Sequence, residues 1–270
     1  MQILLLGTGA AHGIPAFSSE SRVSRYAREH GGKDVRTRTA ALIDGILKID
    51  LPPDTLTQVQ REGLDVRDWI ALLFTHSHDD HFAPSELQYC VIPFNDRDHL
   101  DFSVYGNARI VDELWTRYPN WPFDIHQTTS FEPLSIADYR IVPFRANHKL
   151  DEDSHNFVIE REGKKLIYAT DTGVIFPESM DFLAGAKADC LIIECTEGFV
   201  PTQYHGHLDV HECRQMVEAL RKNGALQDRA RVVTVHHADQ GEGTHDELTA
   251  AFAPDGIEVG YDGMVIDLTE

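Results

Sequence analysis

The chain consists largely of short apolar runs, many of which end directly in a polar or ionisable side chain. Continuous apolar runs of about four to eight residues are typical of buried strands. The turn pairs Asp44-Gly45 and Glu162-Gly163 separate neighbouring runs, as expected for hairpins. The predicted strands cover residues 2–6, 39–43, 46–49, 69–74, 139–146, 156–160, 164–169, 188–194, 231–235, 257–259 and 264–268.

Helices are expected between these strands, at residues 54–63, 84–89, 209–220 and 244–252. For residues 209–220 the signal is a capping box, because Asp209 suits the N-cap position and Glu212 follows three residues later. Strands come first along the chain, and strands and helices then alternate. This order predicts a layered α/β fold. No break in composition divides the chain, so we expect one domain over residues 1–270.

The densest polar cluster follows the apolar run at residues 69–74. It contains His76, His78, Asp80 and His81 within six residues. His76 and His78 are two apart, so an extended chain points them to the same side. Imidazole and carboxylate groups together suit zinc, iron or manganese. The alternative is a polar helix cap with surface histidines, but a cluster this dense at a strand end favours a metal site.

Further candidate ligands close other predicted strands. His148 follows residues 139–146, Asp171 follows residues 164–169, and His236 follows residues 231–235. With His76, four separate strand ends therefore supply His, His, Asp and His.

Other histidines are open to two interpretations. His12 lies in a glycine-rich turn at residues 7–15, where it either faces the metal site or is a simple loop residue. His207 lies in the loop after residues 188–194 and is either functional or part of the approach to a helix. His155, His205 and His237 are expected at the surface.

Two further segments also leave alternatives open. The segment around residues 18–37 is basic, and it is either a solvated loop with a short helix or the source of an arginine that meets an anionic substrate. Residues 118–123 are rich in aromatic side chains, which either wall a pocket or pack in the core.

Composition narrows the functional classes. The 270 residues are 42% hydrophobic and 25% charged, which is ordinary for a globular protein. The net charge of −20 repels nucleic-acid phosphates, so a nucleic-acid partner is not expected. A small anionic substrate is still allowed, because bound dications reverse the local field. No apolar run is long enough to span a bilayer, and no signal peptide is recognised. The four cysteines form no CxxC pair, which favours a reduced, cytoplasmic protein.

The His-x-His-x-Asp-His motif resembles the signature of the metallo-β-lactamase superfamily. The resemblance implies a four-layer αββα sandwich with two divalent metal ions, zinc or manganese, with iron as a further option. By the same resemblance Asp171 bridges both ions and Asp50 supports the ligands. The implied ligands are His76, His78 and His148 for the first ion, and Asp80, His81 and His236 for the second.

A finer match is similar to the cyclic-phosphate phosphodiesterases of bacterial phosphonate breakdown. It rests on Gly7-Thr8-Gly9, Gly13-Ile14-Pro15-Ala16, Asn147-His148, His207-Leu208-Asp209 and Gly260-Tyr261-Asp262-Gly263-Met264. It implies that His207 protonates the leaving group or binds the phosphate. One departure is notable, because that family holds a structural zinc through three cysteines and a histidine. This chain has Ser19, Ser21, Ser24 and Asp239 at those positions, so we expect no structural zinc.

The sequence therefore predicts a dinuclear metal-dependent hydrolase. Its expected reaction is attack by a metal-bridging hydroxide on a small cyclic or nucleotide-like phosphate ester, with Asp80 and His207 as the candidate catalytic residues. The alternatives are a thioester hydrolase or lactonase and, less in keeping with the charge, a transfer RNA 3′-end processing endonuclease. A di-iron oxygen-reducing protein lacks room for its flavin domain, and a metal-holding scaffold would not require the complete ligand set. The expected partner is the small substrate, not a membrane, and a homodimer is compatible with the sequence.

Overall fold

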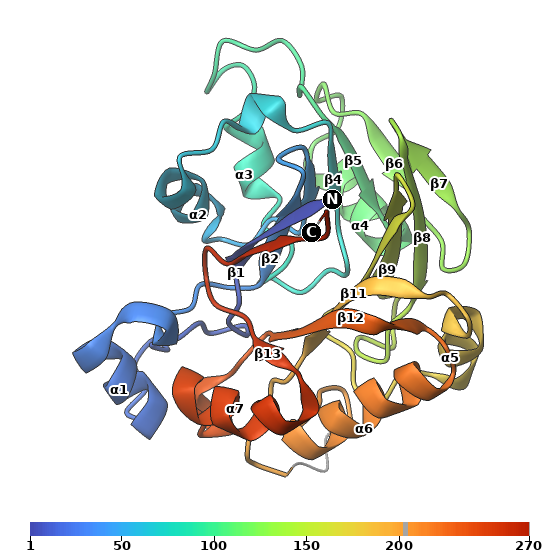
Figure 1. Ribbon diagram of the computed structural model, residues 1–270. Coiled ribbons are helices and arrows are strands. Elements are labelled where there is room, and N and C mark those ends of the chain that lie inside the picture. The colour runs from blue at the N-terminus through green and yellow to red at the C-terminus, as the bar shows by residue number, and fades with distance from the viewer. Residues whose placement is uncertain (202–204, 270) are drawn as a thin grey trace.

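The computed structural model describes residues 1–201 and 205–269. Within these residues, two β-sheets of seven strands each lie face to face, with helices on their outer sides (Figure 1). This arrangement confirms the predicted four-layer αββα sandwich. The first sheet has the order β14-β1-β2-β3-β4-β5-β6. Its strands are β1 (Gln2–Gly7), β2 (Ala40–Ile43), β3 (Leu47–Ile49), β4 (Ala71–Leu73), β5 (Ser103–Gly106), β6 (Ile125–Gln127) and β14 (Val265–Asp267).

The second sheet has the order β13-β12-β11-β10-β9-β8-β7 and is formed by the second half of the chain. Strands β10 to β13 run parallel to one another, as do strands β3 to β6 of the first sheet. The carboxyl ends of neighbouring parallel strands lie at one edge of a sheet, where ligands commonly bind. The strands are β7 (Leu134–Ile136), β8 (Tyr139–Arg145), β9 (His155–Arg161), β10 (Lys164–Ala169), β11 (Ala188–Glu194), β12 (Leu226–Val235) and β13 (Glu258–Val259).

Helices cover the outer face of each sheet. Helices α2, α3 and α4 pack on the first sheet, and α5, α6 and α7 pack on the second (Figure 1). The predicted capping box of Asp209 and Glu212 is present at the start of α6. The bounds are α1 (Arg22–His30), α2 (Thr55–Glu62), α3 (Ser85–Gln88), α4 (Ala108–Arg117), α5 (Pro177–Leu183), α6 (Val210–Lys222) and α7 (His245–Phe252). No described helix combines the length and apolar character needed to cross a bilayer.

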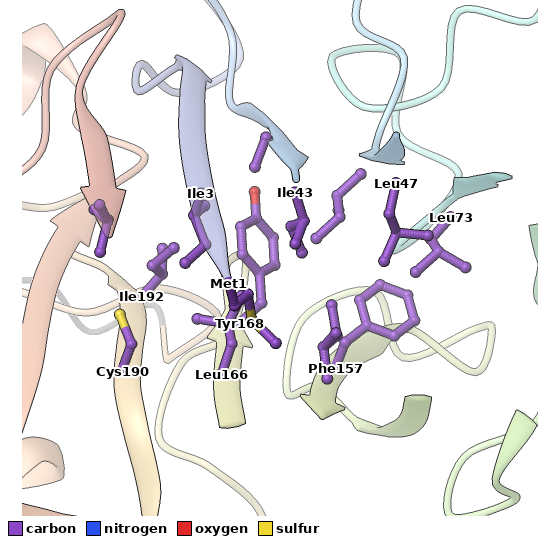
Figure 2. Packing of buried hydrophobic residues seen from close by; sticks show 14 of the residues in the cluster. Met1, Ile3, Ile43, Leu47, Leu73, Phe157, Leu166, Tyr168, Cys190 and Ile192 are labelled. Carbon is purple, nitrogen blue, oxygen red and sulfur yellow. The ribbon is translucent and has the colours of Figure 1, made fainter. Parts of the chain in front are cut away.

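A continuous apolar layer holds the two sheets together. Ile3, Leu47 and Leu73 from the first sheet face Phe157 and Tyr168 from the second (Figure 2). All five side chains are buried, so each removes apolar surface from water. The chain termini meet at this layer, because β14 pairs antiparallel with β1 beside the N-terminus (Figure 1). The packed layer fixes how the strand ends of one sheet face those of the other.

The region between residues 91 and 137 was the least predictable. Strands β5, β6 and β7 and helix α4 lie there and were not predicted, and α5 was also missed. Of the two interpretations for residues 118–123, core packing is correct. Tyr118 and Phe123 are buried in the cluster on the outer side of the first sheet, and Trp121 packs against it.

Candidate metal centre

The candidate site lies where carboxyl ends of strands from both sheets come together. In the first sheet, Asp50 follows β3 and the His76–His81 segment follows β4. In the second sheet, Asp171 follows β10 and His236 follows β12. Parallel strands place these residues at one edge of their sheet, and the packed sandwich brings the two edges together.

Three imidazoles form the first group of candidate ligands. Nδ1 of His78 lies 2.9 Å from Nε2 of His76 and 3.0 Å from Nε2 of His148. His148 reaches the motif from the second sheet, 70 residues later in the chain. Burial, together with the nearby His81, holds the pKa of His76 well below its ordinary range. The imidazole of His76 is therefore neutral and its lone pair is available to a metal.

Two carboxylates and two imidazoles form the second group. Oδ2 of Asp171 lies 2.9 Å from Nε2 of His81 and 3.2 Å from Nε2 of His236. Oδ2 of Asp80 lies 3.3 Å from the same nitrogen of His81. The other oxygen of Asp171 faces the first group, at 3.5 Å from Nε2 of His148. One carboxylate thus reaches both groups, as a bridging ligand requires.

The chemistry of these residues fits divalent metal ions. The ligand atoms within each group lie within 4.8 Å of one another. Nε2 of His81, Nε2 of His236 and Oδ2 of Asp171 are buried and make no hydrogen bond within the described residues. Unpaired polar atoms are costly to bury, and a shared cation satisfies them together. Burial alone would raise the pKa of Asp171, but His236 and His81 outweigh it and keep this carboxyl ionised.

Asp50 orients the imidazoles on the side of the first sheet. Its Oδ2 accepts a hydrogen bond from Nδ1 of His81 at 2.7 Å. Its Oδ1 accepts one from the backbone N–H of Thr75 at 2.8 Å, and the Thr75 hydroxyl lies 3.0 Å from Nδ1 of His76. Asp50 is completely buried. Such outer partners fix which imidazole nitrogen faces the metal.

Glu194 has the corresponding place in the second sheet, and the sequence analysis missed it. It ends β11, is completely buried and accepts a hydrogen bond from the Thr196 hydroxyl. That hydroxyl lies 2.8 Å from Nδ1 of His236. Glu194 also accepts from the backbone N–H of Thr172, next to Asp171, at 2.8 Å. Its signal was the one used for the other ligands, a charged residue closing an apolar run.

His207 lies against both groups of candidate ligands. Its ring centroid is 4.8 Å from that of His148 and 5.3 Å from that of His236. Nδ1 of His207 lies 2.8 Å from Oε1 of Glu194. Burial alone would lower the pKa of His207, but the Glu194 carboxylate outweighs it and raises this pKa to about 9.

The backbone at the site is unusually constrained. Asp50, Asp171 and His236 all have positive φ values, of 58°, 48° and 58°. Non-glycine residues held in this conformation concentrate at functional sites. Gly173 allows a close approach, because a Cβ there would lie 1.6 Å from the backbone oxygen of His205. The turn after Asp171 therefore packs directly against the loop that carries His207.

The serines that replace the expected cysteines converge on Asp239. The hydroxyls of Ser19, Ser21 and Ser24 each lie 2.6 Å from its Oδ2. Its Oδ1 lies 2.9 Å from Nε2 of His12. Of the two alternatives for the segment around residues 18–37, hydrogen bonds therefore hold it.

Several other interpretations are settled by burial and contacts. The prediction that His155 and His237 lie at the surface is wrong, because both are completely or almost completely buried. His155 ends up inside because it begins strand β9 and its ring contacts Asp153 and Thr128. His205 is exposed as predicted.

The arginines of the basic segment are engaged with the protein itself. Arg36 is buried and donates to Thr8 and to the backbone oxygen of Gly260. Arg38 pairs with Asp54 at 3.1 Å. These contacts assign both side chains to structure rather than to a substrate.

Comparison with known proteins identifies a family. Residues 41–237 match the model of the Beta-lactamase superfamily domain. An octanoyltransferase of Porphyromonas gingivalis is 29% identical over 162 residues, which make up 55% of this chain and 31% of that protein. The chain thus spans less than a third of this curated relative, so the activity of the relative does not transfer.

Solved structures share the fold over nearly the full length. A diphosphatase from the PhnP family superposes with a TM-score of 0.77 at 21% identity, covering 98% of this chain and 97% of that chain. Zn²⁺-bound PqqB from Methylobacterium extorquens superposes with a TM-score of 0.75 at 19% identity, covering 99% and 100%. At these identities the likeness establishes the fold.

Proposed function

The chain belongs to the β-lactamase superfamily as a metal-dependent hydrolase, and we propose that it is a phosphodiesterase acting on small cyclic or nucleotide-like phosphate esters. The observation that carries the proposal is Asp171, whose two oxygens face the two groups of candidate ligands. A carboxylate at this position suits the phosphodiesterase branches, whereas the common zinc β-lactamases have cysteine there. The fold shared with a diphosphatase supports the same substrate class.

We assign two divalent ions, zinc or manganese, to the two ligand groups. Bound there, they would supply Lewis acidity and an activated water. The protein would contribute fixed geometry, because Asp50 and Glu194 hold the imidazoles of His81 and His207. A phosphate held at the ligand groups would lie beside His207. The imidazole can give a proton to the leaving oxygen or bind a phosphate oxygen.

The competing substrate classes differ in what they require of the protein. Thioesters and lactones can use the same metal ligands, so direct comparison of substrates must separate them. Precursor transfer RNA requires an extended basic surface to hold a polyanion. The net charge of −20 opposes such binding, and Arg36 and Arg38 are engaged internally.

A substrate screen tests the proposal. Purified protein loaded with manganese, zinc or iron is assayed with bis-p-nitrophenyl phosphate, cyclic nucleotides, a thioester and a lactone. We expect kcat/KM to be highest for a phosphodiester. Faster turnover of the thioester or lactone with every metal would reject the phosphodiesterase assignment. Cleavage of precursor transfer RNA at a rate matching the best small diester would reject the preference for small substrates.

A further inference from the structure

His12 lies at the rim of the site on an element that contributes no metal ligand. It lines a cavity of about 220 Å³ together with His207 and His236. Hydrogen bonds hold its turn to the end of β12: the backbone N–H of Ala10 donates to the oxygen of His237, and that of His237 donates to the oxygen of Thr8, both at 2.9 Å. The turn therefore keeps a constant position relative to His236.

A buried carboxylate holds the His12 ring. The side chain of Asp239 is 1% exposed, and its Oδ1 lies 2.9 Å from Nε2 of His12, whose own side chain is 36% exposed. Three serine hydroxyls occupy the other oxygen of Asp239. A carboxylate placed this way fixes the imidazole with Nε2 toward the protein, as a triad aspartate does. Nδ1 of His12 makes no hydrogen bond to any residue that the structure describes.

The same turn offers unused backbone donors. Within residues 1–201 and 205–269, the backbone N–H groups of Ala11 and His12 donate no hydrogen bond, and both residues line the cavity. Successive free N–H groups in a turn are suited to anions. Arg36 and Arg38 are engaged elsewhere, so this turn is the part of the glycine-rich and basic segments that still has donors available.

We propose that His12, positioned by Asp239, binds a second anionic group of the substrate, a phosphate or carboxylate carried by the ester outside the metal-bound phosphate. This inference rests on the proposed phosphodiesterase function. It names the preferred substrates as small phosphodiesters with a further anionic group. Glu197 also lines the cavity and would favour a neutral hydroxyl instead, so the test must separate the two.

Two substrates that differ by one phosphate provide the test. Thymidine 5′-(p-nitrophenyl phosphate) and its 3′-phosphorylated form are compared by kcat/KM. We expect the wild-type protein to prefer the 3′-phosphorylated ester, and His12→Ala to reduce that preference about tenfold, the usual effect of losing one charge-assisted hydrogen bond. His12→Gln, which retains a neutral donor, should fall between the two. Asp239→Asn should reduce the preference similarly and add little to His12→Ala, because both act through one contact.

The matched control is His126→Ala. His126 forms an exposed pair with Asp124 at 3.0 Å and does not line the cavity, so its loss should not change the preference. Thermal unfolding of each variant separates misfolding from lost binding. No preference for the phosphorylated ester in the wild-type protein, or an equal loss for both esters in His12→Ala, would overturn the inference.

Calorimetry keeps this inference distinct from the proposed function. Dissociation constants for thymidine 3′,5′-bisphosphate and thymidine 5′-phosphate require no turnover. We expect His12→Ala to weaken the bisphosphate about tenfold more than the monophosphate. If no phosphodiester is hydrolysed but this difference is found, the proposed function fails and the anion site stands. If diesters are hydrolysed and the difference is absent, the anion site fails alone.

Discussion

Nδ1 of His207 lies 2.8 Å from Oε1 of Glu194, so a carboxylate at the end of β11 holds a histidine from the loop before α6. Glu194 is completely buried and accepts further hydrogen bonds from Thr172 and Thr196. One carboxylate thereby links His207, the turn after Asp171 and the support of His236. The candidate proton donor and the candidate metal ligands are thus parts of one rigid network.

The first prediction concerns the role of His207. If it protonates the leaving group, His207→Ala should lower kcat about 100-fold or more for diesters with an alkoxide leaving group. The loss for p-nitrophenolate should be much smaller, because that anion leaves without a proton. Parallel measurements with a 2′,3′-cyclic nucleotide and bis-p-nitrophenyl phosphate check this. Equal losses for both would indicate phosphate binding instead of acid catalysis.

The second prediction concerns the carboxylate ligands. Asp171→Ala and Asp80→Ala should each lower kcat/KM for a phosphodiester by more than about 100-fold, the upper range for removal of an outer partner of a metal ligand. The neighbouring Asp79 belongs to the same motif but is exposed and outside both ligand groups, so Asp79→Ala is the matched control. Full activity in Asp171→Ala would contradict a dinuclear centre.

The third prediction is the metal content. Structural zinc sites are closed cages, usually rich in thiolate, whereas Ser19, Ser21 and Ser24 donate hydrogen bonds to Asp239. Elemental analysis of protein purified without chelator should therefore give close to two ions per chain, and Asp80→Ala should lower this number. A tightly bound third ion that survives mutation of His76 would show that the serine cluster holds metal after all.

The fourth prediction is a stability change with pH. Burial alone would raise the pKa of Asp239, but hydrogen bonds from the three serines outweigh it and lower this pKa to about 2. The unfolded value is about 3.9, so the carboxylate stabilises the fold above about pH 4, and this contribution is lost as the pH falls toward 2. At pH 7 it amounts to about 2 kcal/mol.

Urea unfolding of metal-free protein measures this contribution. The difference in unfolding free energy between wild-type protein and Asp239→Asn should be largest at pH 5–7 and should shrink at pH 3. Asp228→Asn, at an exposed position on β12, serves as the control. A difference that stays constant from pH 7 to pH 3 would contradict the assignment.

The local pattern was sufficient for much of the fold. The runs that became β1, β8, β10, β11 and β12 were found because buried strands need continuous apolar side chains, and the start of α6 was found from its capping box. The motif at His76 and the strand-end position of Asp50 needed no tertiary information, since ligand spacing and strand ends are local features. By contrast, β5, β6 and α4 were missed, because short elements in a region rich in aromatic residues depend on tertiary packing.

Only the tertiary structure decided which polar residues act together. Glu194 looked like an ordinary strand end until the fold placed it beside His207 and Thr196. His155 and His237 looked like surface residues, yet their strands carry them into the interior. His12 and Asp239 are 227 positions apart, and their contact exists because the first and last parts of the chain meet at the same edge. Long-range contacts depend on how sheets pack, and the local pattern of polar and apolar residues does not encode that packing.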